Sequence, residues 1–323
     1  MTVFAMRRSA LKCLVLPWLA GWAVAQAAPA SPAGMQAGPR AIWVWEADSF
    51  SMLDSPEAAA AALSFAQERR IHTLYLYADA FGGRNPLVED PALYRRLLRR
   101  LHAAGLRVEA LLGSAYLRTQ EYVLPEKRGA ALAMVKRVLD FNAAGADPSE
   151  HFDAVHLDIE PHALPRWRTE RNALMAQFLD MAAAITALRD ASGQADLPIG
   201  AAIPFWLDGF RLDWRGTDTT AIAHVVGVLD YVAIMDYRNQ AGGSDGIIAH
   251  ARANLDAARA AGRRVVIGLE TGPGELPKVT FRHLANEDLE RALAATTAAF
   301  EDDAAFGGFA IHHYRTYREL VER

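Results

Sequence analysis

Short apolar runs rich in β-branched and aromatic residues recur eight times along this chain of 323 residues. The segments between them have helical spacing, so each run is expected to be a strand followed by a helix. The expected strands are residues 41–45, 73–77, 107–112, 154–158, 199–203, 231–235, 265–269 and 308–311. Eight such units within about 280 residues predict an α/β fold, a single (β/α)8 TIM barrel. A doubly wound open sheet is the competing fold, but the first run lacks the glycine-rich phosphate loop typical of that fold.

The expected helices carry their own boundary signals. They cover residues 56–69, 92–104, 128–143, 173–191, 244–261 and 286–302. Pro56, Pro91 and Pro165 stand where a first helical turn tolerates proline. Gly105 and Gly262 each follow an alanine-rich segment and precede a strand, which is where helices end.

The first residues have the pattern of an export signal. Arg7, Arg8 and Lys12 precede a short apolar run over residues 13–25, and residues 25–27 form an A-x-A cleavage site. This pattern predicts a signal peptide over 1–27, a flexible leader over 28–40 and the barrel domain over 41–323. We therefore expect a periplasmic or secreted bacterial protein without stable membrane insertion after cleavage. An uncleaved, membrane-anchored form is the alternative.

Composition excludes several classes of function. The only cysteine, Cys13, lies in the expected signal, so the mature chain is predicted to use no disulfide and no thiol chemistry. The formal net charge is −4, and no basic face indicates a nucleic-acid partner. The densest basic cluster, residues 95–100, has the spacing of a solvated helix face. Nothing in the sequence indicates an oligomeric state.

The most informative chemistry follows the fourth apolar run. His156, Asp158 and Glu160 alternate with apolar residues, so a strand would place them on one face with Glu160 at its carboxyl end. Two carboxylates this close do not ionise freely, and one is expected to retain a proton near neutral pH. A protonated carboxylic acid is the proton donor that glycoside cleavage requires. The alternative is a solvated Asp and Glu at a strand end.

The other strand ends supply an acidic, aromatic and histidine-bearing set, which the barrel would bring together at its mouth. The set consists of Trp45, Glu46, Tyr77, Asp79, Trp206, Asp236, Tyr237, Arg238, Glu270, His312 and Tyr314. Aromatic faces and carboxylates suit a carbohydrate, which is the expected partner. His312 and His313 have opposite strand parity, so at most one is expected to enter the barrel. No lysine lies at a strand end, which disfavours Schiff-base chemistry, and no cofactor is expected.

Three segments resemble one known family. Asp153-x-x-x-x-Asp158-x-Glu160 resembles the strand-four motif D-x-x-D-x-D-x-E of the chitinase-like glycoside hydrolase family 18. Met235-Asp236-Tyr237 is similar to its strand-six M-x-Y, and residues 307–311 are similar to its last strand. The resemblance implies a (β/α)8 barrel that cleaves an N-acetylated glycan. It implies that Glu160 is the acid, that Asp158 orients the acetamido group, and that Tyr237 hydrogen-bonds to it.

The chain departs from this family at three places. His156 stands where the motif has its middle Asp, Arg238 stands where an acid is frequent, and His312 stands where a tryptophan floors the sugar site. The sequence therefore predicts an exported glycoside hydrolase, distantly similar to this family, that cleaves a poly- or oligosaccharide with Glu160 as general acid and Asp158 in support.

Three alternatives remain at this stage. Glu270 ends the seventh run and could be the nucleophile of a retaining glycosidase, with its carboxyl group roughly 5–5.5 Å from that of Glu160. Otherwise Glu270 accepts a substrate hydroxyl or pairs with Arg238. A metal-assisted hydrolase would use imidazoles and carboxylates at the mouth, namely His156, Asp158, His162, Asp236, His312 and His313. A non-catalytic glycan-binding barrel would retain the aromatic mouth without the acid.

Overall fold

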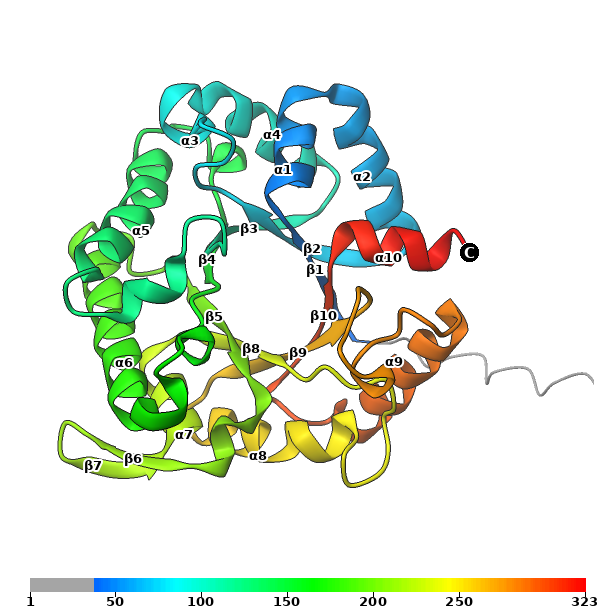
Figure 1. The fold of residues 1–323 in the computed structure, drawn as a ribbon. Coiled ribbons are helices and arrows are strands. Elements are labelled where there is room, and N and C mark those ends of the chain that lie inside the picture. The colour runs from blue at the N-terminus through cyan, green and yellow to red at the C-terminus, as the bar shows by residue number, and fades with distance from the viewer. Residues whose placement is uncertain (1–37) are drawn as a thin grey trace, which may run out of the picture. The chain divides into compact units, whose positions relative to one another are not determined.

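The computed structural model describes residues 38–323, and its centre is a closed barrel of eight parallel strands (Figure 1). The strands are β1 (Arg40–Val44), β2 (Ile71–Tyr77), β3 (Arg107–Leu112), β4 (Ala154–Leu157), β5 (Ile199–Pro204), β8 (Tyr231–Met235), β9 (Arg264–Glu270) and β10 (Phe306–His312). Their order around the barrel is β1-β10-β9-β8-β5-β4-β3-β2. All eight expected strands are present and β1 pairs with β10, so the predicted (β/α)8 barrel is confirmed and the open sheet is excluded.

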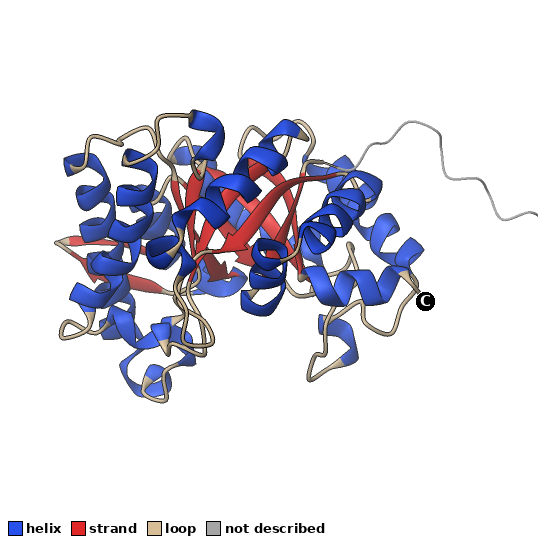
Figure 2. Ribbon diagram, turned by 90° about the horizontal axis from the view of Figure 1, so that it is seen from above, coloured by secondary structure: helices blue, strands red, loops and turns tan. Residues whose placement is uncertain are grey.

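A ring of helices surrounds the strands, so both faces of the sheet are buried (Figures 1 and 2). The helices are α1 (Glu46–Asp54), α2 (Pro56–Glu68), α3 (Pro86–Glu89), α4 (Pro91–Ala103), α5 (Arg128–Ala143), α6 (Trp167–Ala191), α7 (Ala221–Val228), α8 (Ile247–Ala260), α9 (Asn286–Phe300) and α10 (Tyr314–Val321). Parallel strands covered on both faces must be apolar throughout. This requirement explains why the strands appear in the sequence as continuous apolar runs.

Local signals set the helix boundaries as expected. The Ser55 hydroxyl accepts a hydrogen bond from the Ala58 backbone N–H, and Pro56 occupies the first position of α2. In α4, one stripe is buried against the barrel: Tyr94, Leu97, Leu98 and Leu101. Three of the arginines between them are exposed, namely Arg96, Arg99 and Arg100. The basic cluster is therefore largely the solvated face of a helix.

Several short elements were not predicted. They are α1, α3, α7, α10 and an antiparallel hairpin of β6 (Arg211–Trp214) and β7 (Thr217–Thr220) in the connection from β5 to β8. Two of these helices follow their strands almost without a loop: Trp45 is the N-cap of α1 and His313 is the N-cap of α10. The residues after β1 and β10 therefore take helical directions, and strand alternation no longer predicts where they point.

The barrel begins one residue earlier than expected. Arg40 belongs to β1, and its guanidinium lies 2.6 Å from the Glu290 carboxylate. The expected signal peptide, and the leader as far as residue 37, lie outside the described residues. Among residues 38–323, no helix combines the length and the apolar character needed to cross a membrane.

Candidate active site

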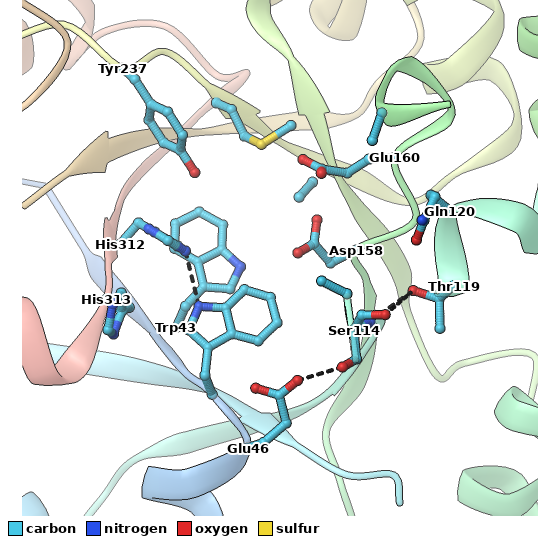
Figure 3. A pocket seen from close by; sticks show the side chains of 15 residues that line it. Trp43, Glu46, Ser114, Thr119, Gln120, Asp158, Glu160, Tyr237, His312 and His313 are labelled. Atoms are coloured by element: carbon cyan, nitrogen blue, oxygen red, sulfur yellow. Dashed lines mark hydrogen bonds between the residues drawn. The ribbon is translucent and has the colours of Figure 1, made fainter. Parts of the chain in front are cut away.

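A cavity of about 480 Å³ lies at the carboxyl ends of the barrel strands. Its wall combines residues from β1, β5, β8 and β10 with the segments that follow β3 and β4. Figure 3 shows Glu160, Asp158 and Tyr237 facing one shared space, with His312 and Tyr237 across from the two carboxylates. The carboxyl ends of the strands are where the chemistry of (β/α)8 enzymes is found.

The end of β3 fixes the backbone of Asp158. The Asp158 N–H donates to the Leu112 carbonyl at 2.7 Å. Gly113 has a φ of +142°, and a Cβ built at Gly113 would lie 2.0 Å from the Asp158 carbonyl oxygen. Only glycine permits this approach. Two residues further on, Glu160 caps the short 3-10 helix η3 (Pro161–Ala163), so both carboxylates project from backbone with fixed geometry.

The surroundings of Asp158 favour its protonated form. Burial, followed by the negative charges of Glu160 and Glu46, raises the pKa of Asp158 well above its usual range. The Asp158 Oδ1 atom is buried and has no hydrogen-bond partner among residues 38–323. The sequence-based expectation that one of the two carboxyl groups retains a proton agrees with this environment and stays a prediction.

His162 lies behind Glu160. Its Nε2 atom is 3.7 Å from Glu160 Oε1, and its ring packs edge-on against Trp167 and Trp206. Burial lowers the pKa of the His162 imidazole, against the raising effect of the Glu160 charge. The His162 ring beside Glu160 is thus itself held in place by two indoles. Trp206, expected to contact substrate, instead belongs to this supporting cluster.

Tyr237 faces the two carboxylates across the cavity (Figure 3). Burial, followed by the negative charges of neighbouring carboxylates, raises the pKa of the Tyr237 phenol well above its usual range. The phenol therefore keeps its proton and can donate a hydrogen bond to a bound molecule. Glu46 also lines the cavity and accepts a hydrogen bond from the Ser114 hydroxyl.

Two indoles form the aromatic part of the wall. Trp43 Nε1–H donates to His156 Nε2 at 3.2 Å, and His156 Nδ1 lies 2.8 Å from the Tyr231 hydroxyl. Gly268 makes room for the Trp43 ring, because a Cβ there would lie 3.2 Å from Cη2. Burial lowers the pKa of His156 to about 3, so the ring is neutral. His156 is thus a support for Trp43 in the barrel interior.

The second indole is held by a different histidine. Trp45 Nε1–H donates to His312 Nε2 at 2.9 Å, and His312 Nδ1 lies 2.8 Å from Glu270 Oε2. The other oxygen, Glu270 Oε1, accepts the Gly272 N–H at 2.6 Å. Glu270 is 8 % exposed and is not among the described residues that line the cavity. Its partner is His312, whereas Arg238 pairs with Asp245 at 2.8 Å.

Other predicted site residues lie away from the cavity. The Tyr77 hydroxyl donates to the Ala80 carbonyl, and Asp79 pairs with Arg137 at 2.6 Å. Both belong to a buried network outside the mouth. Tyr314 is the first residue of α10 and packs on Phe65, because the helix turns its side chain outward from the barrel. Their assignment as substrate-binding residues is not supported by the geometry.

Asp236 and Arg238 belong to a separate charged cluster. Asp236 Oδ1 lies 2.9 Å from His250 Nδ1, and His250 Nε2 lies 3.2 Å from Asp245. Burial raises the pKa of Asp236 to about 8, in spite of the positive charge of Arg238. Asp236 is completely buried, and neither residue lines the cavity within the described part of the chain. This cluster attaches the loop after β8 to α8.

Sequence reasoning did not assign several wall residues to the site, among them Trp43, Thr119 and Gln120. Trp43 was available from parity, because it alternates with Trp45 along the first strand. His312 and His313 both line the cavity, so the expectation that at most one of them would enter is wrong. Alternation fails there because β10 ends at His312. No sequence signal identifies Gln120, which a 3-10 turn brings to the wall.

The six side chains considered for metal binding do not form one site. His156 and His312 are each bound at both ring nitrogens by protein groups, and Asp236 lies with His250 outside the cavity. Within residues 38–323, no group of three or more His, Cys, Asp or Glu side chains has the arrangement needed to hold an ion.

Solved structures similar to this chain are glycoside hydrolases. A GH18 chitinase from Cycas revoluta in complex with (GlcNAc)3 has a TM-score of 0.51, with 16% identity over 86% of this chain and 95% of the chitinase. A plant class V chitinase mutant from Cycas revoluta, also with (GlcNAc)3, has a TM-score of 0.53, with 15% identity over 88% of this chain and 97% of that one.

A third neighbour is a β-galactosidase from the psychrophilic Marinomonas ef1, with a TM-score of 0.53 and 12% identity over 85% of this chain and 53% of the galactosidase. At these identities the likeness establishes a barrel of the type found in glycoside hydrolases. No model of a protein family matches the chain. No curated protein matches it either.

Proposed function

We propose that this protein is a glycoside hydrolase that cleaves an N-acetylated poly- or oligosaccharide, with Glu160 as the proton donor. One observation carries the proposal: Glu160, Asp158 and Tyr237 come from two separate strands and face the same aromatic-walled cavity. The barrel neighbours that contain (GlcNAc)3 support an N-acetylated sugar as the ligand.

Glu160 is suited to be the general acid because it borders the cavity beside a second carboxyl group. The His162 ring, which packs on two indoles, lies 3.7 Å from the Glu160 carboxyl group, and Asp158 is two residues away. Burial favours the protonated form of Asp158 at a pH where an isolated carboxyl group is ionised. An acetamido N–H donated to Asp158 favours the carboxylate form of Asp158. We propose that the proton released by Asp158 moves to Glu160, where the leaving oxygen needs it.

The reaction we propose is substrate-assisted. Glu160 gives its proton to the glycosidic oxygen, the bond from that oxygen to the anomeric carbon breaks, and the acetamido oxygen bonds to the anomeric carbon. The Asp158 carboxylate balances the positive charge of the resulting ring, while Tyr237 donates a hydrogen bond to the same group. Water then attacks the anomeric carbon, the bond from that carbon to the acetamido oxygen breaks and restores the acetamido group, and the water gives a proton to Glu160. Two displacements at one carbon retain the anomeric configuration.

Two features favour this route over direct attack by a protein carboxylate. Both oxygens of Glu270 are already hydrogen-bonded, and Glu270 is outside the wall of the described cavity. Asp158 and Tyr237, in contrast, face the space beside Glu160. The group that attacks the anomeric carbon is therefore best supplied by the substrate.

The test compares the complete chain with Glu160→Gln on N-acetylated and non-acetylated oligosaccharides, with product release followed by mass spectrometry. Turnover of N-acetylated substrates should fall by about 10²–10⁴ in the variant, the usual contribution of a general acid. Glu301→Gln, at an exposed carboxylate after α9, is the matched control and should retain full activity.

Three outcomes would contradict the proposal. Equal turnover by Glu160→Gln would remove Glu160 as the acid. Binding of oligosaccharides by both proteins without any turnover would indicate a glycan-binding barrel. Loss of turnover on chelation, with recovery on adding a divalent ion, would indicate a metal-assisted hydrolase.

Export of the protein is part of the same proposal. It rests on the basic start, apolar run and A-x-A site within residues 1–27. Expression in a bacterium followed by intact mass measurement of the periplasmic and culture fractions tests it. We expect a chain that begins at residue 28. An uncleaved chain confined to the cytoplasm would contradict export.

A further inference from the structure

We infer that Glu270 and His312 are a positioning pair, whose role is to hold the Trp45 indole as a platform for a sugar ring. The inference rests on the proposed function and deepens it, because it assigns the aromatic side of the sugar site. It also gives Glu270 a role different from that of a nucleophile.

The three residues form a hydrogen-bonded row across neighbouring strands. Glu270 and His312 are register partners where β9 and β10 pair, and Trp45 directly follows β1, which is the next strand around the barrel. The spacing is 2.8 Å from Glu270 Oε2 to His312 Nδ1 and 2.9 Å from His312 Nε2 to Trp45 Nε1. The barrel register therefore brings together residues that are far apart in sequence.

Only one arrangement of protons satisfies this row. An indole Nε1–H can only donate, so His312 Nε2 must present a lone pair to Trp45. The single proton of the neutral His312 ring is then on Nδ1 and is donated to Glu270. Glu270 accepts a second hydrogen bond from the Gly272 N–H at 2.6 Å, so it acts as a carboxylate with both oxygens used. Each group thus fixes the orientation of the next.

The row ends in the cavity wall opposite the carboxylates. Trp45, His312 and Tyr237 all line the cavity, and the His312 and Tyr237 ring centroids lie 5.9 Å apart. Figure 3 shows His312 and Tyr237 facing the space occupied by Asp158 and Glu160 from the other side. A flat indole at this place offers an apolar face to the C–H side of a sugar ring, while the carboxylates face its polar groups.

This arrangement makes a distinctive prediction about Glu270. A nucleophile needs a free oxygen aimed at the anomeric carbon, and its removal abolishes turnover. A positioning residue acts through His312, so its removal loosens Trp45 and weakens binding much more than it slows chemistry. Glu270→Ala and His312→Leu should have similar effects, and the double variant should be little worse than either one.

The experiment measures kcat and KM of each variant for chitotriose, (GlcNAc)3. The Kd of chitotriose is measured for the same substitutions made in a Glu160→Gln background. His312→Leu should raise KM and Kd about tenfold, the typical effect of losing one hydrogen bond, with kcat within about threefold. His312→Gln is the conservative variant, because its amide can accept from Trp45 and donate to Glu270. It should restore binding to within about threefold of the unmodified chain.

Tryptophan fluorescence reports the pair independently of activity. His312→Leu should change the emission of the chain, and the same substitution in a Trp45→Phe background should change it far less. If the unmodified chain cleaves no glycan but this fluorescence difference appears, the proposed function fails while the positioning pair stands.

The positioning role would be overturned by either of two results. One is a fall in kcat of more than about 10³-fold for Glu270→Ala at unchanged Kd, the signature of a lost nucleophile. The other is an identical fluorescence change for His312→Leu with and without Trp45, which would indicate a general structural disturbance.

Discussion

Glu160 and Glu270 both lie near the carboxyl ends of the barrel strands, and their surroundings differ completely. Glu160, after β4, borders the cavity, and its titratable neighbours include Asp158 and the half-buried His162. Glu270, at the end of β9, is buried, and both its oxygens accept hydrogen bonds from His312 and Gly272. Both follow apolar runs, Glu160 three residues after the end of β4 and Glu270 as the last residue of β9. What separates a chemically available carboxylate from a structural one is therefore the partners that the fold supplies.

The comparison explains why strand-end position alone is a weak guide to chemistry. Carboxylates also end or follow β2 and β8, and they too are occupied, Asp79 by Arg137 and Asp236 by His250. A carboxylate held in this way lies outside the described cavity wall, so it cannot reach a molecule bound there. The β4 end keeps its carboxylates unpaired, and the raised pKa of Asp158 is the cost of that arrangement.

The largest expected effect is a difference between the two glutamate variants in how strongly kcat depends on the leaving group of the substrate. Glu160→Ala should lose about 10³–10⁴ in kcat on a glycan but far less on an aryl glycoside whose phenol leaves without protonation. For Glu270→Ala, kcat should fall only slightly, and by the same factor on both substrates. Steady-state kinetics on the two substrates measure this. If kcat of Glu270→Ala depended on the leaving group as strongly as kcat of Glu160→Ala does, the two glutamates would not have different roles.

The next effect concerns the partner carboxylate. Asp158→Asn cannot provide the negative charge that balances the cyclised acetamido group, so kcat should fall about 10²-fold. The pH profile of kcat should also lose the contribution that comes from the titration of Asp158 beside Glu160. Asp302→Asn, at an exposed carboxylate, serves as the control. Full activity in Asp158→Asn would exclude a charge-balancing role.

Tyr237→Phe should have a smaller effect. Burial and the nearby carboxylates raise the pKa of the phenol, so it remains a hydrogen-bond donor across the working pH range. Its removal should lower kcat/KM about tenfold for an N-acetylated substrate. A substrate that bears a free amine instead of the acetamido group should be affected less. Equal losses on both substrates would place the Tyr237 contact elsewhere on the sugar.

The smallest effect on activity is expected at Asp236, outside the cavity. Its pKa is raised from 3.8 to about 8, so the folded state binds more protons than the unfolded state between these values, and stability falls as pH rises. His250 has a lowered pKa and acts in the opposite direction below pH 6.5. Between pH 6.5 and pH 8, the titration of Asp236 should therefore lower the free energy of unfolding of the unmodified chain by about 1–2 kcal/mol. Asp236→Asn should abolish this decrease.

Urea unfolding at both pH values measures this effect, with Asp245→Asn as the matched control, because Asp245 and Arg238 also face His250. A pH dependence that is unchanged in Asp236→Asn would show that Asp236 does not titrate in this window. Its kinetic constants should stay close to those of the unmodified chain.

Much of the fold could be predicted from the sequence because its signals are local. The apolar runs gave all eight strands to within two residues at each end, and α5 begins and ends where the spacing predicts. The elements that were missed, such as α1, α10 and the β6–β7 hairpin, are short and lack a long periodic pattern. Each depends on contacts with distant parts of the chain.

The sequence by itself determined the alternation that closes the barrel and the parity that puts Asp158 and Glu160 beside one cavity. Both depend on residues one or two positions apart. Only the tertiary structure decided which strand-end side chains are free. Trp45, Glu270 and His312 meet because β1, β9 and β10 are neighbours in the closed barrel. Hydrogen bonds between such distant residues decide which carboxylate can act, and no local pattern encodes them.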